Sequence, residues 1–312
     1  MNICQQNKII GLIAGKSSGT LTRALQGKGY KVALICGKVT DDGYDIADFK
    51  LCKFFEVDND EKEITESIDF FKNLNIDGFI LGTGTWFAIE IAIRLGKVGL
   101  KISHSIDVLK TYKDKSITKQ IFRDNFFPVP KEEILFEYKE PKLTPPFVVK
   151  SNIDLFPVFL CHSYDEFNLF INSLSKEVIS KGVLVEEYIK GNDCTIPVFS
   201  TKKNVIAPKI IYWSKQENYR LKGFGELEKF RISEKNEKII LQKCQQLISK
   251  SSYLGVCRFD IRISEDSFYF LEINSVVSIR EEGSSFQAMK NNGINYIEES
   301  INVYLNNIYE NN

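Results

Sequence analysis

Four polar residues on two neighbouring segments near the carboxyl end have the side chains and the spacing for metal and phosphate chemistry. Residues 257–263 and 268–275 alternate polar with β-branched or aromatic residues and flank a short acidic turn. This pattern predicts two antiparallel strands joined by a hairpin. Because side chains alternate faces along a strand, one face of the pair should carry two carboxylates, an amide and a guanidinium. These groups belong to Arg258, Asp260, Glu272 and Asn274.

Carboxylate and amide oxygens are the ligands that Mg²⁺ prefers, and it binds them together with substrate phosphates. The patch therefore predicts a divalent metal site that also takes ATP. A surface hairpin with solvated charges would show the same local pattern. The rest of the chain has to decide between these two interpretations.

The composition limits the classes of function. The chain has 312 residues, 43% of them hydrophobic, which suffices for two or three packed subdomains. Lysine plus arginine equals aspartate plus glutamate at 41 each, so no basic surface for nucleic acid or an anionic membrane is predicted. No apolar run approaches the roughly 20 residues that span a bilayer. Seven scattered cysteines without a C-x-x-C pair indicate either reduced thiols in the cytoplasm or small core residues.

The two histidines of the chain narrow the chemistry further. His104 and His162 lie in no recognisable metal-ligand or catalytic-triad spacing, and we expect both to be structural. Catalysis would then fall to carboxylates, lysines, arginines and a cofactor.

The first third of the chain alternates short apolar runs with helical patterns. Apolar runs at residues 8–14, 31–36, 54–57 and 78–82 predict a doubly wound parallel sheet of four or five strands that ends near residue 107. The glycines after the first run are Gly11, Gly15 and Gly19, and their spacing fits neither a P-loop nor a dinucleotide fingerprint. We interpret them as a tight turn at a strand end.

The middle of the chain has a different texture. One helix is expected from residue 107 to residue 125, because Pro128 and Pro130 follow it. Strands are expected at residues 145–150, ending in Lys150, and at residues 183–189. From spacing alone, four charges would be solvated: Lys115, Lys119, Arg262 and Glu265. Glu186 and Glu187 could simply alternate on an edge strand.

Five short motifs, in this order, resemble those of the ATP-grasp superfamily of carboxylate-amine ligases. They are D-K-x-x-x-K at 114–119, the strand ending in Lys150, E-E-Y-I-x-G-x-D at 186–193, R-x-D at 258–260 and E-x-N at 272–274. The loop at 274–286 is similar to that of the D-alanine:D-alanine ligase group. The amino-terminal sheet looks more like those of the carbamoyl-phosphate-synthetase and pyrrolysine-biosynthesis ligases.

The resemblance implies an α/β protein with α+β character in its ATP-binding part. Residues 1–107 would form a Rossmann-like pre-ATP-grasp domain with the doubly wound parallel sheet. Residues 108–185 would form the small ATP-grasp subdomain. Residues 186–312 would form the C-terminal subdomain with the Mg/ATP and substrate site.

The resemblance also implies roles for individual residues. The nucleotide contacts would be Lys115 and Lys150 to phosphates, Glu186, Glu187 and Ile189 in the adenine hinge, Asp193 to the ribose and Lys215 to the γ-phosphate. The metal ligands would be Asp260, Glu272 and Asn274, with Arg258 stabilising the reacting acyl phosphate. A substrate carboxylate would be held by Arg280, Ser284 and Ser285, although Arg280 could equally pair with a neighbouring glutamate.

The activity implied by the resemblance is ligation of a small carboxylate to a small amine, with ATP and Mg²⁺, or Mn²⁺ in its place, in the cytoplasm. A homodimer is one candidate for the assembly. A kinase on the same fold is a first alternative. A non-catalytic nucleotide-binding protein is the second, because residues 151–160 replace the glycine-rich lid of such ligases with a segment that has no glycine. Ser151 and Asn152 side chains could take over the role of that lid.

Overall fold

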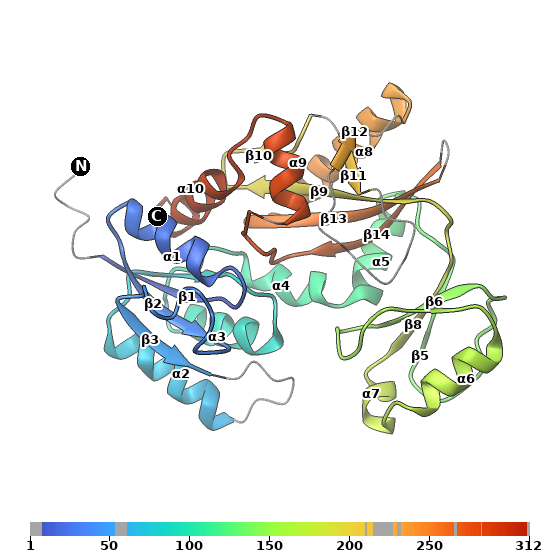
Figure 1. The fold of residues 1–312 in the computed structure, drawn as a ribbon, viewed down its shortest axis with the longest axis horizontal. Helices are drawn as coiled ribbons and strands as arrows, with labels where there is room; N and C mark the ends of the chain where they lie inside the picture. The colour runs from blue at the N-terminus through green and yellow to red at the C-terminus, as the bar shows by residue number, and fades with distance from the viewer. Residues whose placement is uncertain are drawn as a thin grey trace.

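The computed structural model describes residues 8–53, 61–209, 211–214, 227–229, 232–264, 267–281 and 283–310. Within these residues the strands form three sheets, each covered by helices (Figure 1). In Figure 1 the first sheet lies at the left, the third above the centre and the second at the lower right.

The first sheet is parallel, with the strand order β3-β2-β1-β4. Its elements are β1 (Ile9–Ile13), α1 (Ser18–Gly27), β2 (Lys31–Cys36), β3 (Phe49–Cys52), α2 (Glu61–Asn73), β4 (Gly78–Leu81) and α3 (Trp86–Lys97). Ile10 packs in one core with Leu21 of α1, whereas Ile13 packs in another core with Ile91 of α3. Both faces are therefore buried, which explains the continuous apolar runs of these strands. The predicted parallel sheet is confirmed.

One strand of this sheet differs from the prediction. The strand beside β2 is β3 at residues 49–52, where the sequence reads F-K-L-C. The predicted strand at residues 54–57 lies outside the described residues.

The second sheet is antiparallel, with the order β5-β8-β6-β7. Its elements are β5 (Glu132–Leu135), β6 (Phe147–Ser151), β7 (Phe159–Cys161), α6 (Tyr164–Asn172), α7 (Lys176–Ser180) and β8 (Val183–Glu187). Phe147 and Val149 of β6 point into a core with Phe167 and Ile171 of α6. The alternate side chain, Lys150, is thereby directed to the other face of the sheet.

The third sheet is also antiparallel, and β13 lies between β9 and β14 within it. Its strands are β9 (Asn192–Ser200), β10 (Val205–Ile206), β11 (Tyr212–Ser214), β12 (Leu227–Lys229), β13 (Gly255–Ser264) and β14 (Ser267–Asn274). Its helices are α8 (Glu234–Lys250), α9 (Ser284–Asn291) and α10 (Tyr296–Tyr309). Cys257 and Phe259 pack with Ile240 of α8, whereas Val256 packs with Tyr304 of α10, so helices cover both faces.

Two helices, rather than the single one expected, connect the first sheet to the others. They are α4 (Ile106–Lys113) and α5 (Lys115–Asp124), and both contact β14. The break is at Asp114, which has an extended backbone and whose carboxylate accepts a hydrogen bond from Ile117 N at 3.0 Å. Aspartate is a strong N-cap residue because its oxygen satisfies an N–H of the first helical turn. Asp114 therefore ends one helix and starts the next.

The division of the chain at residues 107 and 185 stays a proposal. Strand β8 ends at Glu187, two residues beyond the second boundary. Tyr112 of α4 and Phe122 of α5 share the core of the third sheet with Phe259, although both helices fall in the proposed small subdomain. No helix among the described residues combines the length and the apolar character needed to cross a membrane.

Candidate active site

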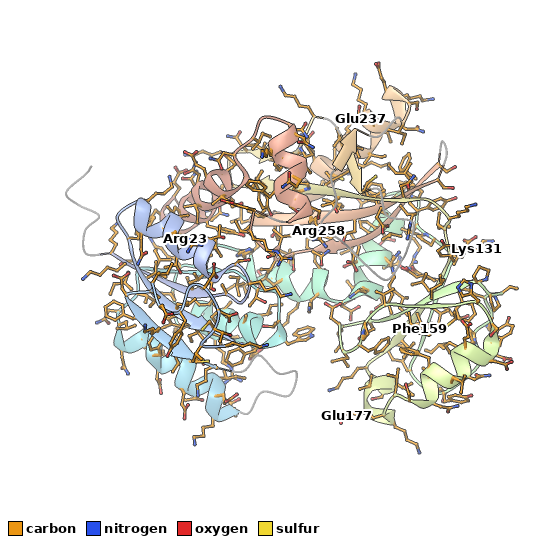
Figure 2. All side chains as sticks on the ribbon, viewed as in Figure 1. Arg23, Lys131, Phe159, Glu177, Glu237 and Arg258 are labelled. Atoms are coloured by element: carbon orange, nitrogen blue, oxygen red, sulfur yellow. The ribbon has the colours of Figure 1, made fainter. Side chains whose placement is uncertain are left out.

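The hairpin of β13 and β14 brings the four residues of the predicted patch together. Arg258 pairs with Asn274, and Asp260 pairs with Glu272, across the two antiparallel strands. Their side chains therefore share one face. The pairing shifts directly after Asp260, and such a bulge bends and twists a strand locally. Figure 2 shows Arg258 near the middle of the molecule.

Ion pairs and hydrogen bonds connect the side chains of this patch. Asp260 Oδ2 accepts from Arg258 Nη2 at 2.8 Å and from Asn274 Nδ2 at 3.0 Å. Asn274 Nδ2 also donates to Glu272 Oε1 at 3.2 Å. Burial works against the charge of Arg258, but Asp260 and Glu272 outweigh it and hold the pKa of the guanidinium above its ordinary value. Arg258 is thus a fixed positive charge.

The donor set of the patch fits a hard divalent cation. Two carboxylates and one carboxamide offer oxygen ligands on the same face. The NH₂ group of Asn274 bridges Asp260 and Glu272, and turning the amide over would direct its oxygen to the same place. No group of three or more His, Cys, Asp or Glu side chains that could hold a metal occurs among the described residues. A cation here would therefore complete its shell with phosphate oxygens or water.

Lys115, the first residue of α5, adds positive charge to the edge of the patch. Its Nζ lies 4.0 Å from Glu272 Oε2 and forms an ion pair with Asp154. Lys113 Nζ lies 2.5 Å from the other carboxylate oxygen of Asp154. These residues and Asn274 line a small cavity of about 30 Å³.

Lys150 belongs to a second, buried ion cluster. Its Nζ pairs with Glu186 Oε2, and Glu186 Oε1 lies 2.6 Å from Lys119 Nζ. Lys119 Nζ is also 3.7 Å from Glu132 Oε2 and donates to the Phe270 carbonyl at 3.3 Å. Burial acts to raise the pKa of Glu186, but the two lysines outweigh it and lower that pKa. The cluster joins the second sheet to α5 and β14.

For this cluster the solvated interpretation of the lysines is wrong, and the edge-strand alternative for Glu186 does not hold. Lys119 is fully buried, and Lys115 is also buried, rather than solvated. Helix α5 contacts β14 of the third sheet, and Lys119 pairs with Glu186 of the second sheet. Residues four apart share a helix face, so Lys115 and Lys119 both point toward these sheets. Glu186 does not lie on an edge strand, since β8 runs between β5 and β6.

The predicted adenine and ribose residues lie at and after the end of β8. Glu187 and Ile189 are half-buried there. Asp193 is opposite Arg262 on β13, and its Oδ1 lies 3.2 Å from Arg262 Nε. The prediction that Arg262 is solvated is wrong. It is only 4% exposed, because its guanidinium also donates to the Gly191 carbonyl at 2.7 Å.

The residues predicted to hold a substrate carboxylate follow the hairpin. Arg280 is half-buried in the loop that begins where Asn274 ends β14. Ser284 and Ser285 are in the first turn of α9, and Ser285 is buried. The loop at 275–281 thus connects the patch to these serines. Lys215 and Glu265 lie outside the described residues.

The segment after Lys150 is ordered by its own polar side chains. Ser151 Oγ accepts hydrogen bonds from two backbone amides within residues 151–155, at 3.3 and 2.7 Å. Asn152 Oδ1 accepts from Ser116 N at 2.9 Å, and the Asn152 carbonyl accepts from Lys115 N at 3.1 Å. These contacts fix the glycine-free segment against the start of α5.

The first strand-to-helix turn supports the loop at 275–281. The sequence did not predict this contact. Ser17 Oγ is buried, hydrogen-bonds with Ser278 Oγ at 2.8 Å and accepts from Ile279 N at 3.0 Å. The partners are 261 and 262 positions away, so no local motif could have marked them. Lys113, Asp154 and Ser17 are the site residues that the motifs missed.

We expect Ser17→Ala to loosen the loop at 275–281. The change leaves the buried N–H of Ile279 without this acceptor, which should cost about 1–3 kcal/mol in the free energy of unfolding. Urea unfolding measures this loss. Ser180→Ala removes an exposed hydroxyl and should stay within about 0.5 kcal/mol of the wild type. Equal stability of the two variants would contradict the proposed support.

Comparisons with known proteins identify the fold. A family model described as the RimK-like ATP-grasp domain matches residues 103–300. The chain is 25% identical over 208 residues to the D-alanine--D-alanine ligase of Petrotoga mobilis. The aligned region covers 64% of this chain and 68% of that protein.

Two solved structures share the architecture. The D-alanine--D-alanine ligase from Bacillus anthracis, complexed with ATP, has a TM-score of 0.69 and 17% identity over 98% of this chain and 99% of that one. The L-amino acid ligase from Bacillus licheniformis has a TM-score of 0.73 and 17% identity over 98% of this chain and 75% of that one. At such identities the similarity is one of fold. The family match, however, spans more than half of the chain and contains the hairpin patch and both ion clusters, so the chain belongs to the RimK-like ATP-grasp family.

Proposed function

We propose that this protein is an ATP- and Mg²⁺-dependent carboxylate-amine ligase that forms an amide or peptide bond through an acyl phosphate. The observation that carries the proposal is the register of β13 and β14. It places Asp260 opposite Glu272 and Arg258 opposite Asn274, with Lys115 Nζ 4.0 Å from Glu272. The relative named D-alanine--D-alanine ligase supports the same reaction class.

The chemistry follows from the poor leaving ability of a carboxylate oxygen. Transfer of the terminal phosphoryl group of ATP to the carboxylate gives an acyl phosphate and ADP. The amine then attacks the carbonyl carbon, and inorganic phosphate leaves. Negative charge is dispersed over the transferred group, so positioning and electrostatics supply most of the catalysis.

The chain's own residues would divide this work. Arg258 would face the acyl phosphate. Its Nη2 donates to Asp260 Oδ2 at 2.8 Å, which fixes the position of the guanidinium. Lys115 and Lys150 would bind phosphate oxygens. The carboxylates and amide of the patch would hold Mg²⁺, which neutralises phosphate charge when bound.

The remaining proposed contacts concern the two ends of the substrate site. Residues 186–189 would read adenine through their backbone, because the Glu186 side chain is engaged by two lysines. Asp193 would accept from the ribose. On the acceptor side, Arg280 and the serines that begin α9 would hold the carboxylate of an amino acid or a similar small acid.

No protein nucleophile is needed for this route. Burial lowers the pKa of His104 to about 3, so this histidine is neutral and inside the protein at neutral pH. His162 lies on the surface.

Product analysis tests the proposal. A panel of amino acids and amines is incubated with ATP and Mg²⁺, and phosphate, ADP and new amides are measured. Phosphate together with an amide supports the ligase. A stable phosphorylated substrate without an amide would instead indicate a kinase, and nucleotide binding without ADP would indicate a non-catalytic protein.

Lys150→Ala should weaken ATP binding. A hydrogen bond to a charged group contributes about 1.5–3 kcal/mol, so the Kd for ATP measured by calorimetry should rise roughly 10- to 100-fold. Lys142→Ala, at an exposed position of the same sheet region, is the matched control and should bind ATP like the wild type. An unchanged Kd in Lys150→Ala would remove Lys150 from the nucleotide site.

A further inference from the structure

Two lysines converge on one carboxylate beside the hairpin patch. Lys113 Nζ lies 2.5 Å from Asp154 Oδ2, and Lys115 Nζ pairs with Asp154 Oδ1. Each carboxylate oxygen thus has its own ammonium group. Lys115 Nζ is also 4.0 Å from Glu272 Oε2, so this arrangement adjoins the proposed metal ligands.

The break between α4 and α5 makes this convergence possible. In a continuous helix, residues two apart point in different directions. Lys113 is the last residue of α4 and Lys115 the first of α5, with the extended residue Asp114 between them. The change of direction at Asp114 turns both side chains toward Asp154. Two ammonium groups repel each other, and an anion between them offsets this repulsion. Water screens the repulsion little here, because the two lysine side chains are only 15% and 11% exposed.

Little space is left next to these side chains while Asp154 is paired with both lysines. The cavity lined by Lys113, Lys115, Asp154 and Glu272 measures about 30 Å³, which is room for about one or two water molecules. A phosphate can contact both ammonium groups only if Asp154 leaves its place between them.

Asp154 is the lining group that can move most easily. Its side chain is 51% exposed and it lies in the loop after β6, whereas the two lysines belong to helices and Glu272 to a strand. Asp154 has a φ of 62°, in the left-handed region that costs most residues energy but that aspartate and asparagine tolerate. The lysines, Lys115 first, outweigh the effect of burial and hold the pKa of Asp154 below its ordinary value, so the carboxylate is charged at neutral pH.

We propose that Lys113 and Lys115 form an anion clamp for the phosphate chain of the nucleotide, and that Asp154 fills this clamp until the nucleotide displaces it. The inference rests on the proposed function and deepens it. It assigns a phosphate contact to Lys113, which lies outside the motifs, and a competing role to the glycine-free segment. ATP would exchange one anion for another between the same two ammonium groups.

Trp86 reports on this exchange. Its indole Nε1 donates to the carbonyl of Ile153, the residue before Asp154, at 3.2 Å. Displacement of Asp154 should therefore alter the surroundings of the indole. The chain has two tryptophans, so Trp213→Phe makes Trp86 the single emitter.

The first test is the affinity for ATP with Mg²⁺ in Asp154→Asn. Asparagine keeps the shape and tolerates the left-handed backbone, but it removes the charge that competes with phosphate. If the wild type favours the clamp filled by Asp154 about tenfold over the open clamp, the Kd for ATP should be about tenfold lower in Asp154→Asn than in the wild type. Asp165→Asn, at an exposed position of α6, removes the same charge elsewhere and should leave the Kd unchanged. Repeating both at 1 M salt, where the Debye length is about 3 Å, removes long-range effects.

The second test is Lys113→Met in the Asp154→Asn background, where the clamp is free of its carboxylate. The Kd for ATP should rise about tenfold there, whereas Lys110→Met, an exposed lysine on the same helix, should change nothing. In the Trp213→Phe variant, which keeps Asp154, ATP should change the emission of Trp86. In Asp154→Asn most of that change should be present before ATP is added.

Three results decide the matter. Equal or weaker ATP binding by Asp154→Asn would overturn the competing role of Asp154. An unchanged Kd after Lys113→Met would remove Lys113 from the clamp. Absence of ATP binding by the wild type would instead refute the proposed function, and this measurement comes first, so the two failures are distinguishable.

Discussion

Glu272→Ala should abolish Mg²⁺-dependent ADP formation while the protein stays folded. Glu272 supplies one of the two carboxylates of the patch, and Asn274 Nδ2 bridges it to Asp260. With a single carboxylate left, a divalent cation that bridges phosphates would be held weakly and out of position. We expect kcat to fall roughly 10³-fold or more, as when a group that stabilises transition-state charge is removed. Higher Mg²⁺ should restore part of the rate.

The fold should tolerate this change because each charge beside Glu272 keeps another partner. Lys115 keeps its ion pair with Asp154, and Arg258 keeps Asp260. The free energy of unfolding should change by less than about 1 kcal/mol. Glu177→Gln is the control: this exposed residue of α7 lies at the lower edge of the molecule in Figure 2, away from Arg258. Normal turnover in Glu272→Ala would remove the metal site proposed here.

The central hairpin could be predicted from the sequence because its information is local. Alternation fixes which side chains share a face along one strand, and a short turn between two such runs predicts that the two strands pair. The shared patch is confirmed, but its exact pairs do not follow from these two facts. The register at the turn would set Asp260 opposite Leu271, and the bulge after Asp260 moves it opposite Glu272. The parallel sheet was predictable for the same reason, since the apolar runs of its strands are local.

The ion clusters could not be predicted, because their members are far apart in the chain. The helix that contains Lys119 gives no local sign that this lysine is buried. Its partner Glu186 lies on β8, far away in the sequence. The support of the loop at 275–281 by Ser17 could not be predicted for the same reason, since the two segments are far apart in the chain. The break at Asp114 did carry a local signal, since aspartate before a helical pattern favours an N-cap. The continuous polar and apolar pattern on both sides concealed it.

Glu186→Ala should destabilise the protein more than any other single change proposed here. Glu186 is the shared partner of Lys119 and Lys150, and all three side chains are buried. Removing one member of a buried ion cluster leaves charge without compensation, which typically costs about 3–5 kcal/mol. Lys119→Ala should cost less in the Glu186→Ala background than in the wild type, because the ion pair with Glu186 is already gone and only the contacts with Glu132 and Phe270 remain. Urea unfolding of both single variants and the double variant measures this coupling.

The pH dependence of stability distinguishes this ion cluster from simple packing. The lysines hold the pKa of Glu186 below the ordinary 4.5, so on acidification the unfolded chain takes up the proton before the native protein does. The stabilisation is thus fully present above about pH 5 and is lost as pH falls through the native pKa. The stability difference between wild type and Glu186→Gln should therefore shrink below pH 4.5. A Glu186→Gln deficit that stayed constant from pH 7 to pH 3.5 would mean that shape, and not charge, makes Glu186 necessary.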